Sequence, residues 1–252
     1  MMFFCFIGHC PEEETCFSKG GEYKMSYPEL VVMLTYQDRT VDKAFQIFEE
    51  CKNTKAKYWG FKEEPLPLAQ MKELYEYMRA CGKITSLEVV AYTEEECLEG
   101  ARKAVECGVD YLMGTMYFDS VNEICHSSGI RYMPFVGEVT ERPSILNGTA
   151  EGMIEEAKRY LDKGVYGIDL LGYRYTGDAP ALNRTFVNAM KQIGAPVCIA
   201  GSVDSYRRLD EVWETGAWSF TIGGAFFEHK FGDDFAKQID TVYTYMEQKS
   251  KE

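Results

Sequence analysis

Eight short apolar runs alternate with amphipathic segments from Pro28 onward, and this alternation restricts the fold more than any other feature. Short apolar runs are typical of buried strands, and the segments between them carry apolar residues at helical spacing. Strands that alternate with helices form parallel sheets through βαβ units. Eight such units with connections of a few residues predict a single-domain TIM (β/α)8 barrel.

The alternative architecture with the same alternation is an open doubly wound sheet, which would need a switch-point crevice. Neither a GxGxxG motif nor a P-loop motif occurs in the chain, and we expect no cofactor. The expected strands cover residues 30–37, 58–62, 86–92, 111–116, 132–137, 166–171 and 197–200, with the eighth ending at residues 222–224. Residues 138–149 form the longest expected loop, which is typical of a lid or a binding element.

Composition restricts the partners of the protein. Of the 252 residues, 46% are hydrophobic, which is enough for one large core. The formal net charge of −13 argues against nucleic acid or an anionic membrane as a partner, and no apolar run is long enough to span a bilayer. A homo-oligomer is compatible with this composition. The nine cysteines are scattered rather than paired, as in proteins of a reducing compartment, so we expect a cytoplasmic protein.

Residues 1–27 do not follow the pattern of the rest, and we expect an N-terminal extension ahead of a barrel domain at residues 28–252. Met25 lies just before the first strand and fits a native start there. Cys5, His9, Cys10 and Cys16 offer metal ligands within the extension. Structural zinc sites normally show two tight ligand pairs, so we predict no metal site.

The segment from Pro196 to Glu228 predicts an anion site. Its two strands end in Gly201-Ser202 and in Gly223-Gly224. Strand ends with glycine direct several backbone N–H groups at one point, which binds a phosphate group without a dedicated cation. The loops after the last two strands of a (β/α)8 barrel are where phosphate is usually bound. We therefore predict that Gly201, Ser202, Gly223 and Gly224 bind the phosphate of a small phosphorylated metabolite.

Lys62 and Glu88 are the first candidates for chemistry. Strict alternation along their strands directs both side chains into the barrel, on neighbouring strands. A partly desolvated lysine can act as a base or form a Schiff base, and a carboxylate can move a proton next to a carbonyl. The same pair also fits a structural ion pair that closes the barrel interior.

The remaining candidates follow other strands. Asp169 is a second potential acid or base, with a hydrogen-bonded interior aspartate as the alternative. Arg174 is a potential fork for a phosphate or carboxylate group. Asp38 and Glu138 are expected on opposite sides of the barrel as a carboxylate pair, although Asp38 also fits the cap of the first helix. We expect Asp204 to cap the seventh helix.

Three motifs in the last third of the chain carry a family resemblance: LLGYRYTGD, VCIAGS and FTIGGAFFE. They resemble the ribulose-phosphate-binding barrel superfamily, most of all the N-acetylmannosamine-6-phosphate 2-epimerases. The resemblance covers residues 167–228 and implies phosphate binding at the four residues named above, with Gly172 and Tyr173 beside the substrate. The epimerases have a lysine after the third strand and a glutamate before the glycine of the seventh strand. Here those places hold the Glu88–Ala91 run and Ala200.

Two main functions follow. The first is an enzyme that acts on a phosphorylated sugar or a similar carbonyl compound, by epimerisation, isomerisation or aldol cleavage, with Lys62, Glu88 and Asp169 as catalytic residues. The second is a barrel that binds a phosphorylated metabolite without catalysis. A third is a metal-assisted lyase that uses Asp38, Glu88 and Glu138.

Overall fold

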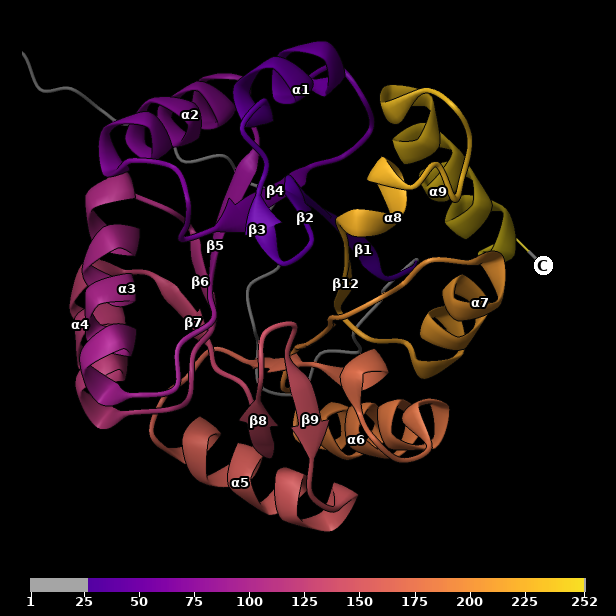
Figure 1. The fold of residues 1–252 in the computed structure, drawn as a ribbon. Coiled ribbons are helices and arrows are strands. Elements are labelled where there is room, and N and C mark those ends of the chain that lie inside the picture. The colour runs from indigo at the N-terminus through magenta and orange to yellow at the C-terminus, as the bar shows by residue number, and fades with distance from the viewer. Residues whose placement is uncertain (1–26, 252) are drawn as a thin grey trace, which may run out of the picture.

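The computed structural model describes residues 27–251, so the expected extension and its cysteines and histidine lie outside the described residues. Eight parallel strands form a central ring that helices surround, which confirms the TIM barrel (Figure 1). The strands are β1 (Glu29–Met33), β4 (Tyr58–Lys62), β5 (Ile84–Val89), β6 (Tyr111–Gly114), β7 (Arg131–Met133), β10 (Ile168–Leu170), β11 (Val197–Ile199) and β12 (Ser219–Ile222).

Hydrogen bonds run around the whole ring. The order of paired strands is β10-β11-β12-β1-β4-β5-β6-β7. The two outer members are joined by hydrogen bonds from the Tyr166 N–H to the Tyr132 carbonyl (3.0 Å) and from the Asp169 N–H to the Pro134 carbonyl (3.1 Å). The strands are parallel, so all their carboxyl ends, and the loops that follow them, meet at one mouth.

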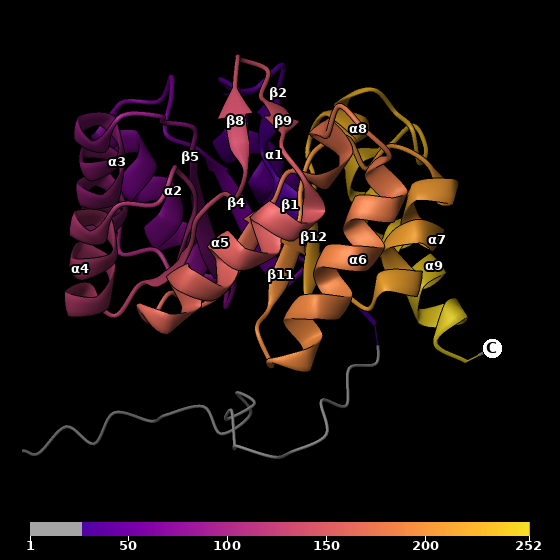
Figure 2. The ribbon, with the colours of Figure 1, turned by 90° about the horizontal axis from the view of Figure 1, so that it is seen from below.

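The helices form the outer layer. They are α1 (Ala44–Cys51), α2 (Leu68–Ala80), α3 (Glu94–Cys107), α4 (Asp119–Ser128), α5 (Ala150–Asp162), the 3-10 helix η1 (Gly172–Arg174), α6 (Ala179–Gln192), α7 (Tyr206–Thr215), α8 (Gly224–Phe227) and α9 (Phe235–Lys249). Two hairpins, β2 (Thr35–Tyr36) with β3 (Arg39–Thr40) and β8 (Glu138–Thr140) with β9 (Ile145–Asn147), lie with α8 at the mouth (Figure 2).

Strand β4 shows how the sequence directs its side chains. Trp59 and Phe61 are fully buried in the layer between strands and helices, where Trp59 meets Phe48 edge-on (5.1 Å between ring centroids) and Phe61 stacks on Tyr75 (4.1 Å). The alternate residue Lys62 therefore faces the barrel interior. Aromatic residues on one face thus place a charged side chain at the mouth.

The amino ends of the strands are filled by a separate apolar cluster. Tyr111, Met113, Met133 and Cys198 are buried together, and Trp218 packs against them. The Tyr111 and Trp218 rings lie 5.3 Å apart. The barrel is therefore a packed core at this level rather than a pore, as in other (β/α)8 barrels.

Several segments differ from the expected pattern. The first strand ends at Met33 rather than at residue 37, because the chain turns back through the β2–β3 hairpin with Gln37 and Asp38 at positive φ. Helix α1 begins after Lys43, so Asp38 is not its cap. The expected loop at residues 138–149 contains the β8–β9 hairpin.

The cysteines form no disulfide within the described residues. Cys51, Cys81, Cys97, Cys107, Cys125 and Cys198 are free thiols. None of the helices within residues 27–251 is long and apolar enough to cross a bilayer.

Gly60 lies beside Lys62 and has no room for a side chain. A Cβ at this position would lie 2.2 Å from Ser86 Oγ and 2.5 Å from the Ser86 carbonyl oxygen. We expect Gly60→Ala to lower the free energy of unfolding by roughly 1–3 kcal/mol, because the neighbouring strand must shift. Urea denaturation of the wild type and the variant measures this difference in the free energy of unfolding.

The matched control is Gly152→Ala in the exposed first turn of α5, where the nearest atom, Thr149 Oγ1, is 3.2 Å away. Its effect should stay within about 1 kcal/mol, since alanine favours helix. Equal effects of the two substitutions would contradict the close packing inferred at Gly60.

Candidate active site at the barrel mouth

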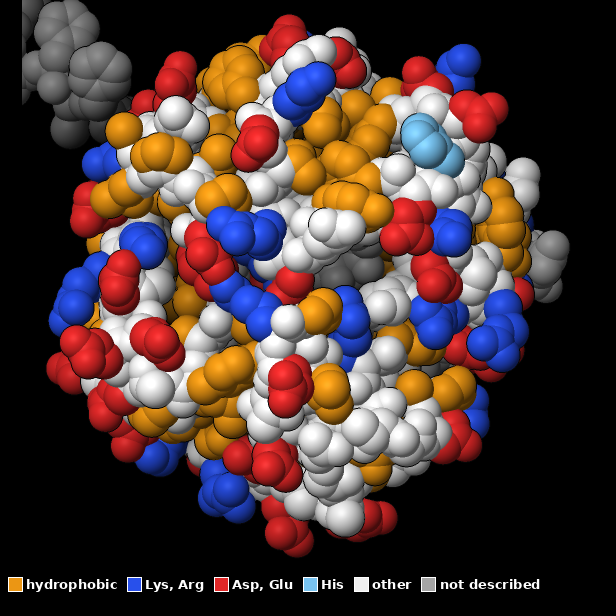
Figure 3. Space-filling view, in the orientation of Figure 1, with side chains coloured by type: hydrophobic (Ala, Val, Ile, Leu, Met, Phe, Trp, Pro, Cys, Tyr) orange, Lys and Arg blue, Asp and Glu red, His pale blue; other side chains and the backbone are white. Residues whose placement is uncertain are grey.

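A pocket of about 260 Å³ opens at the carboxyl ends of the strands. The mouth is hollowed near its centre, and charged side chains of both signs surround the hollow (Figure 3). The pocket is lined from the ends of β1, β4, β5, β10, β11 and β12 and from both hairpins. The polar lining residues are Thr35, Gln37, Asp38, Lys62, Glu88, Ser144, Arg174, Ser202, Asp204, Thr221 and Glu228, together with Gly201, Gly223 and Gly224.

Three charged side chains meet on one side of this pocket, and we call Asp38, Lys62 and Glu88 the ionic triad. Lys62 Nζ donates to Asp38 Oδ1 and lies 3.2 Å from Glu88 Oε1. Lys62 and Glu88 are also direct partners in the β4–β5 register. The contact expected between Lys62 and Glu88 is present, and Asp38 joins it from the β2–β3 hairpin.

The Lys62 amine is charged. Burial by itself would lower the pKa of this group, since only 5% of Lys62 is exposed. The Glu88 and Asp38 carboxylates outweigh burial, and the pKa of Lys62 lies above its ordinary value. A Schiff base requires a neutral amine, so the triad favours a Lys62 ammonium that stabilises negative charge over a Lys62 nucleophile.

On the other side of the pocket, two glycine-containing turns face each other. Gly201 and Ser202 have positive φ (84° and 50°), and a Cβ on Gly201 would lie 2.7 Å from Arg174 Cγ. A Cβ on Gly223 would lie 2.6 Å from Thr35 Oγ1. Among the turn and cap hydrogen bonds of residues 27–251, none uses the N–H groups of Gly201, Ser202, Gly223 or Gly224. Turns of this kind can form anion-binding concavities.

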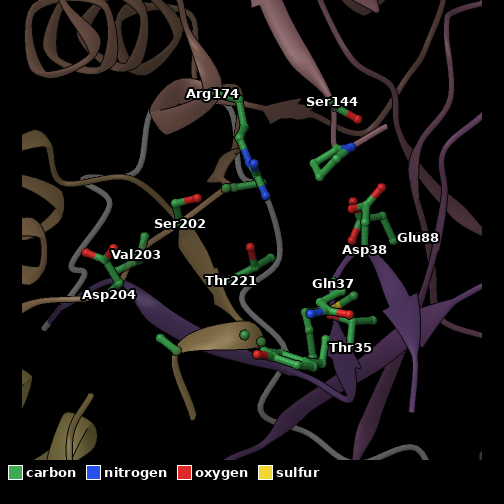
Figure 4. Close-up of a pocket in the computed structure, with 18 of the residues that line it drawn as sticks. Thr35, Gln37, Asp38, Glu88, Ser144, Arg174, Ser202, Val203, Asp204 and Thr221 are labelled. Atoms are coloured by element: carbon green, nitrogen blue, oxygen red, sulfur yellow. The ribbon is translucent and has the colours of Figure 1, made fainter. Parts of the chain in front are cut away.

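Arg174 supplies a cation to this side. It lines the pocket from η1, beside Gly201, and its side chain points into the pocket (Figure 4). No carboxylate within the described part of the chain forms an ion pair with Arg174, whereas Lys62 already has two. Arg174 is therefore suited to pair with an anionic ligand.

Gly172 and Tyr173, also expected beside the substrate, do not line the pocket. A Cβ on Gly172 would lie 1.7 Å from Asn183 Oδ1, so glycine at this position lets η1 pack against α6. Tyr173 faces α7, where its hydroxyl donates to Glu211 Oε2 (3.0 Å). Their part is to hold the segment that carries Arg174.

The turn after β11 is held from α7. Arg208 donates to the Ser202 carbonyl and pairs with Asp204 (3.1 Å), and its guanidinium lies over the Tyr173 ring at 4.9 Å from the centroid. Asp204 was expected to cap this helix, which is wrong: the residue before α7 is Ser205, and Asp204 lines the pocket instead. Arg208 thus fixes the turn in which Ser202 lies.

Asp169 lies in the barrel interior and does not line the pocket. It is 1% exposed, and neither carboxyl oxygen has a hydrogen-bond partner. Burial, and secondly the nearby Glu88 carboxylate, raise the pKa of Asp169 well above its usual range. This shift favours the neutral form of the side chain in the folded protein.

Glu138 lies on the exposed side of the β8–β9 hairpin and outside the pocket. Asp38 lines the pocket and pairs with Lys62, whereas Glu138 does not line it, so the two carboxylates expected as a pair do not share the site. Within residues 27–251, no three His, Cys, Asp or Glu side chains are grouped as metal ligands.

The pocket therefore has two unlike sides. Arg174 and Ser202 lie on one side, Asp38 and Glu88 on the other, and Thr221 between them (Figure 4). The first side offers backbone N–H groups and a free guanidinium, which suit a phosphate group. The second has two carboxylates for one ammonium, so it can accept a proton and stabilise negative charge on an oxygen atom.

Sequence patterns missed several of these residues. Thr35, the first residue of β2, follows β1 closely, and Thr221 lies near the end of β12, so a systematic list of polar residues at and just after strand ends would have included them. Ser144 and Arg142 come from the β8–β9 hairpin. Nothing local in the sequence indicates that its turn reaches the far side of the mouth.

Comparisons with known proteins establish the fold. No protein-family model matches the chain, and no curated protein matches it. Orotidine 5'-phosphate decarboxylase from Pyrococcus horikoshii OT3 is similar in structure (TM-score 0.64, 15% identity, 86% of this chain and 98% of that chain). N-acetylmannosamine-6-phosphate 2-epimerase from Clostridium perfringens is similar too (TM-score 0.58, 13% identity, 82% of this chain and 93% of that chain).

The tryptophan synthase alpha chain from Legionella pneumophila subsp. pneumophila shares the same architecture (TM-score 0.59, 13% identity, 89% of this chain and 92% of that chain). These three structures therefore share the (β/α)8 barrel fold with this chain. At these identities the likeness says nothing of the reaction, which has to be argued from the site.

Asp169 gives a pH-dependent prediction. Its pKa is raised in the folded state, so the folded protein holds a proton that the unfolded chain releases above a pH of about 4. This contribution to stability is complete below that pH and decreases as the pH rises toward the folded-state pKa. Asp169→Asn cannot ionise, so we expect its thermal midpoint to rise relative to the wild type between pH 5 and pH 8.

The control is Asp162→Asn, which removes an exposed charge on α5 and should show a nearly constant difference over this range. Calorimetry at several pH values measures both differences. A relative loss of stability for Asp169→Asn with rising pH would mean that Asp169 is ionised and paired.

Proposed function

We propose that the protein is an enzyme that binds a small phosphorylated sugar, or a similar phosphorylated carbonyl compound, and transfers a proton next to the carbonyl group. The two-sided pocket is the observation that carries this proposal: anion-binding groups on one side and the ionic triad on the other. Epimerisation or isomerisation is the reaction class. We place the protein in the cytoplasm, since its described thiols are free.

The phosphate end consists of the N–H groups of Gly201, Ser202, Gly223 and Gly224 together with Arg174. The positive φ values of Gly201 and Ser202 turn successive peptide groups, a geometry that forms anion-binding concavities. The guanidinium of Arg174 adds a charge-assisted hydrogen bond. A phosphate held there directs the rest of the molecule past Thr221 toward the triad (Figure 4).

At the triad, Lys62 and Glu88 have different parts. The Lys62 ammonium hydrogen-bonds the carbonyl oxygen of the substrate and stabilises the oxyanion that forms when a neighbouring carbon loses its proton. Glu88 takes that proton, with Asp38 as the second carboxylate that keeps Lys62 charged. The raised pKa of Lys62 disfavours aldol cleavage through a Schiff base, which was the other reaction expected from this residue pair.

The phosphate end can be tested with inorganic phosphate. We expect phosphate to raise the thermal midpoint of the wild type, and Arg174→Gln to weaken binding by on the order of tenfold or more, because a hydrogen bond to a charged group is lost. The matched control is Arg207→Gln on α7, whose side chain is 79% exposed and outside the pocket. Equal phosphate affinity of the wild type and Arg174→Gln would contradict this anion site.

The reaction can be tested in D₂O with a panel of ketose, aldose and N-acetylhexosamine phosphates. We expect at least one ligand to gain deuterium next to its carbonyl group, measured by NMR and mass spectrometry. Lys62→Met and Glu88→Gln should each slow this exchange by ~10²-fold or more. The control Glu138→Gln removes a carboxylate outside the pocket and should exchange at the wild-type rate.

The alternative is a barrel that binds a phosphorylated metabolite without catalysis. The lysine with two carboxylates in the triad is the observation that favours it, since a structural ion pair has the same form. Phosphate binding without deuterium exchange into any bound ligand would support this alternative. An adduct on Lys62 trapped by borohydride would show instead that the Schiff-base route operates.

A further inference from the structure

Arg142 lies on the turn of the β8–β9 hairpin, and it connects this turn to the segments that follow β4 and β5. Its guanidinium donates to Glu64 and to Glu63 Oε1 (2.5 Å), which follow β4, and to the Val90 carbonyl (3.2 Å), which follows β5. These partners are about fifty to eighty residues away in the sequence. A single side chain therefore holds the hairpin across the mouth.

A second contact secures the same turn. Tyr92, which follows β5, donates its hydroxyl to the Glu141 carbonyl (2.6 Å) and lies 3.3 Å from Ser144 Oγ. Pro143 and Ser144, next to Arg142, line the pocket. The part of the hairpin that Arg142 holds is thus the part that covers the space between the two sides of the pocket.

Arg142 also reaches the ionic triad. The Asp38 carboxylate has two oxygens that can accept hydrogen bonds. Oδ1 accepts one from Lys62, whereas Oδ2 is buried and has no hydrogen-bond partner. Arg142 Nε lies 3.6 Å from Asp38 Oδ2. Arg142 therefore partly offsets the charge of the Asp38 oxygen that Lys62 does not reach.

The charge balance of this group depends on Arg142. The four carboxylates of Asp38, Glu63, Glu64 and Glu88 are in contact with two cations, Lys62 and Arg142. Without the guanidinium, all four would remain beside one ammonium. Asp38 and Glu63 are largely buried there, with side chains 10% and 13% exposed, so their repulsion would be screened only weakly by solvent.

We propose that Arg142 is a positioning residue: by pairing with Asp38 it holds that carboxylate against Lys62, and it ties closure of the β8–β9 hairpin to assembly of the ionic triad. When the hairpin lifts to admit a ligand, Asp38 loses its second cation. When it closes, the guanidinium returns and the triad is complete. This inference rests on the proposed proton transfer for its catalytic consequence, but the link between the hairpin and Asp38 stands without it.

The test uses Arg142→Gln in the full-length protein. We expect amide hydrogen exchange of residues 138–147 and of residues 35–40 to become faster together, by on the order of tenfold or more, because the Arg142–Asp38 pair joins the two hairpins. Inorganic phosphate should bind with unchanged affinity, since its site is on the other side of the pocket. Deuterium transfer to substrate should fall while phosphate affinity stays.

Arg39→Gln is the matched control, because Arg39 is exposed on the neighbouring hairpin and lies outside the pocket. It removes the same charge and should leave both hairpins protected. Arg142→Lys should restore part of the protection, since lysine keeps the charge but not the forked geometry.

A double-mutant cycle separates this role from general support of the fold. If Arg142 acts on the β2–β3 hairpin through Asp38, the effect of Arg142→Gln on amide exchange in residues 35–40 becomes much smaller in an Asp38→Asn background. Additive effects, or faster exchange in residues 138–147 alone, would overturn the proposal. A wild type that transfers no deuterium would contradict the proposed function, whereas the amide-exchange cycle would still decide whether Arg142 and Asp38 are coupled.

Discussion

The burial of one charged amine is the constraint on which the mouth of this barrel depends. An ammonium with 5% exposure is strongly disfavoured in a protein interior unless carboxylates and hydrogen bonds replace its water. Lys62 meets this condition with Asp38 from one hairpin and Glu88 from the next strand. Trp59 and Phe61 pack behind β4, and Gly60, which has no side chain, lets β4 lie close to β5. Together they position the lysine. The ionic triad is thus a result of barrel packing as much as of charge.

The anion side depends on a different kind of order. Backbone N–H groups have no flexible side chain, so their direction is set by turns, and these turns need support from outside the pocket. Arg208 and Tyr173 give this support from α7 and η1, while close packing of Gly172 against Asn183 fixes the segment that carries Arg174. Residues that never meet a ligand therefore determine how well the pocket would bind one.

Sequence periodicity predicted the fold and the pairing of Lys62 with Glu88, because alternation in a strand determines direction and parallel register determines neighbours. It gave the wrong surroundings for two aspartates. Asp204 was expected to cap a helix, and Asp38 to pair with Glu138 or to cap a helix, whereas tertiary contacts bring both into the pocket. Arg142 could not be predicted. The residues to which it donates hydrogen bonds lie 52 to 79 residues away, and no local pattern carries contacts of that range.

The pairing of β1 with β12 affects how the protein folds during its synthesis. The triad comes from the first third of the chain, and the glycine turns come from the last quarter, so the two sides of the pocket meet only when the last strand joins the first. A growing chain on the ribosome can build the triad strands early, yet it has no complete pocket until β12 has emerged and docked. A ligand that needs both sides of the pocket would bind only protein molecules in which the ring is closed. Such a ligand would stabilise the last step of folding.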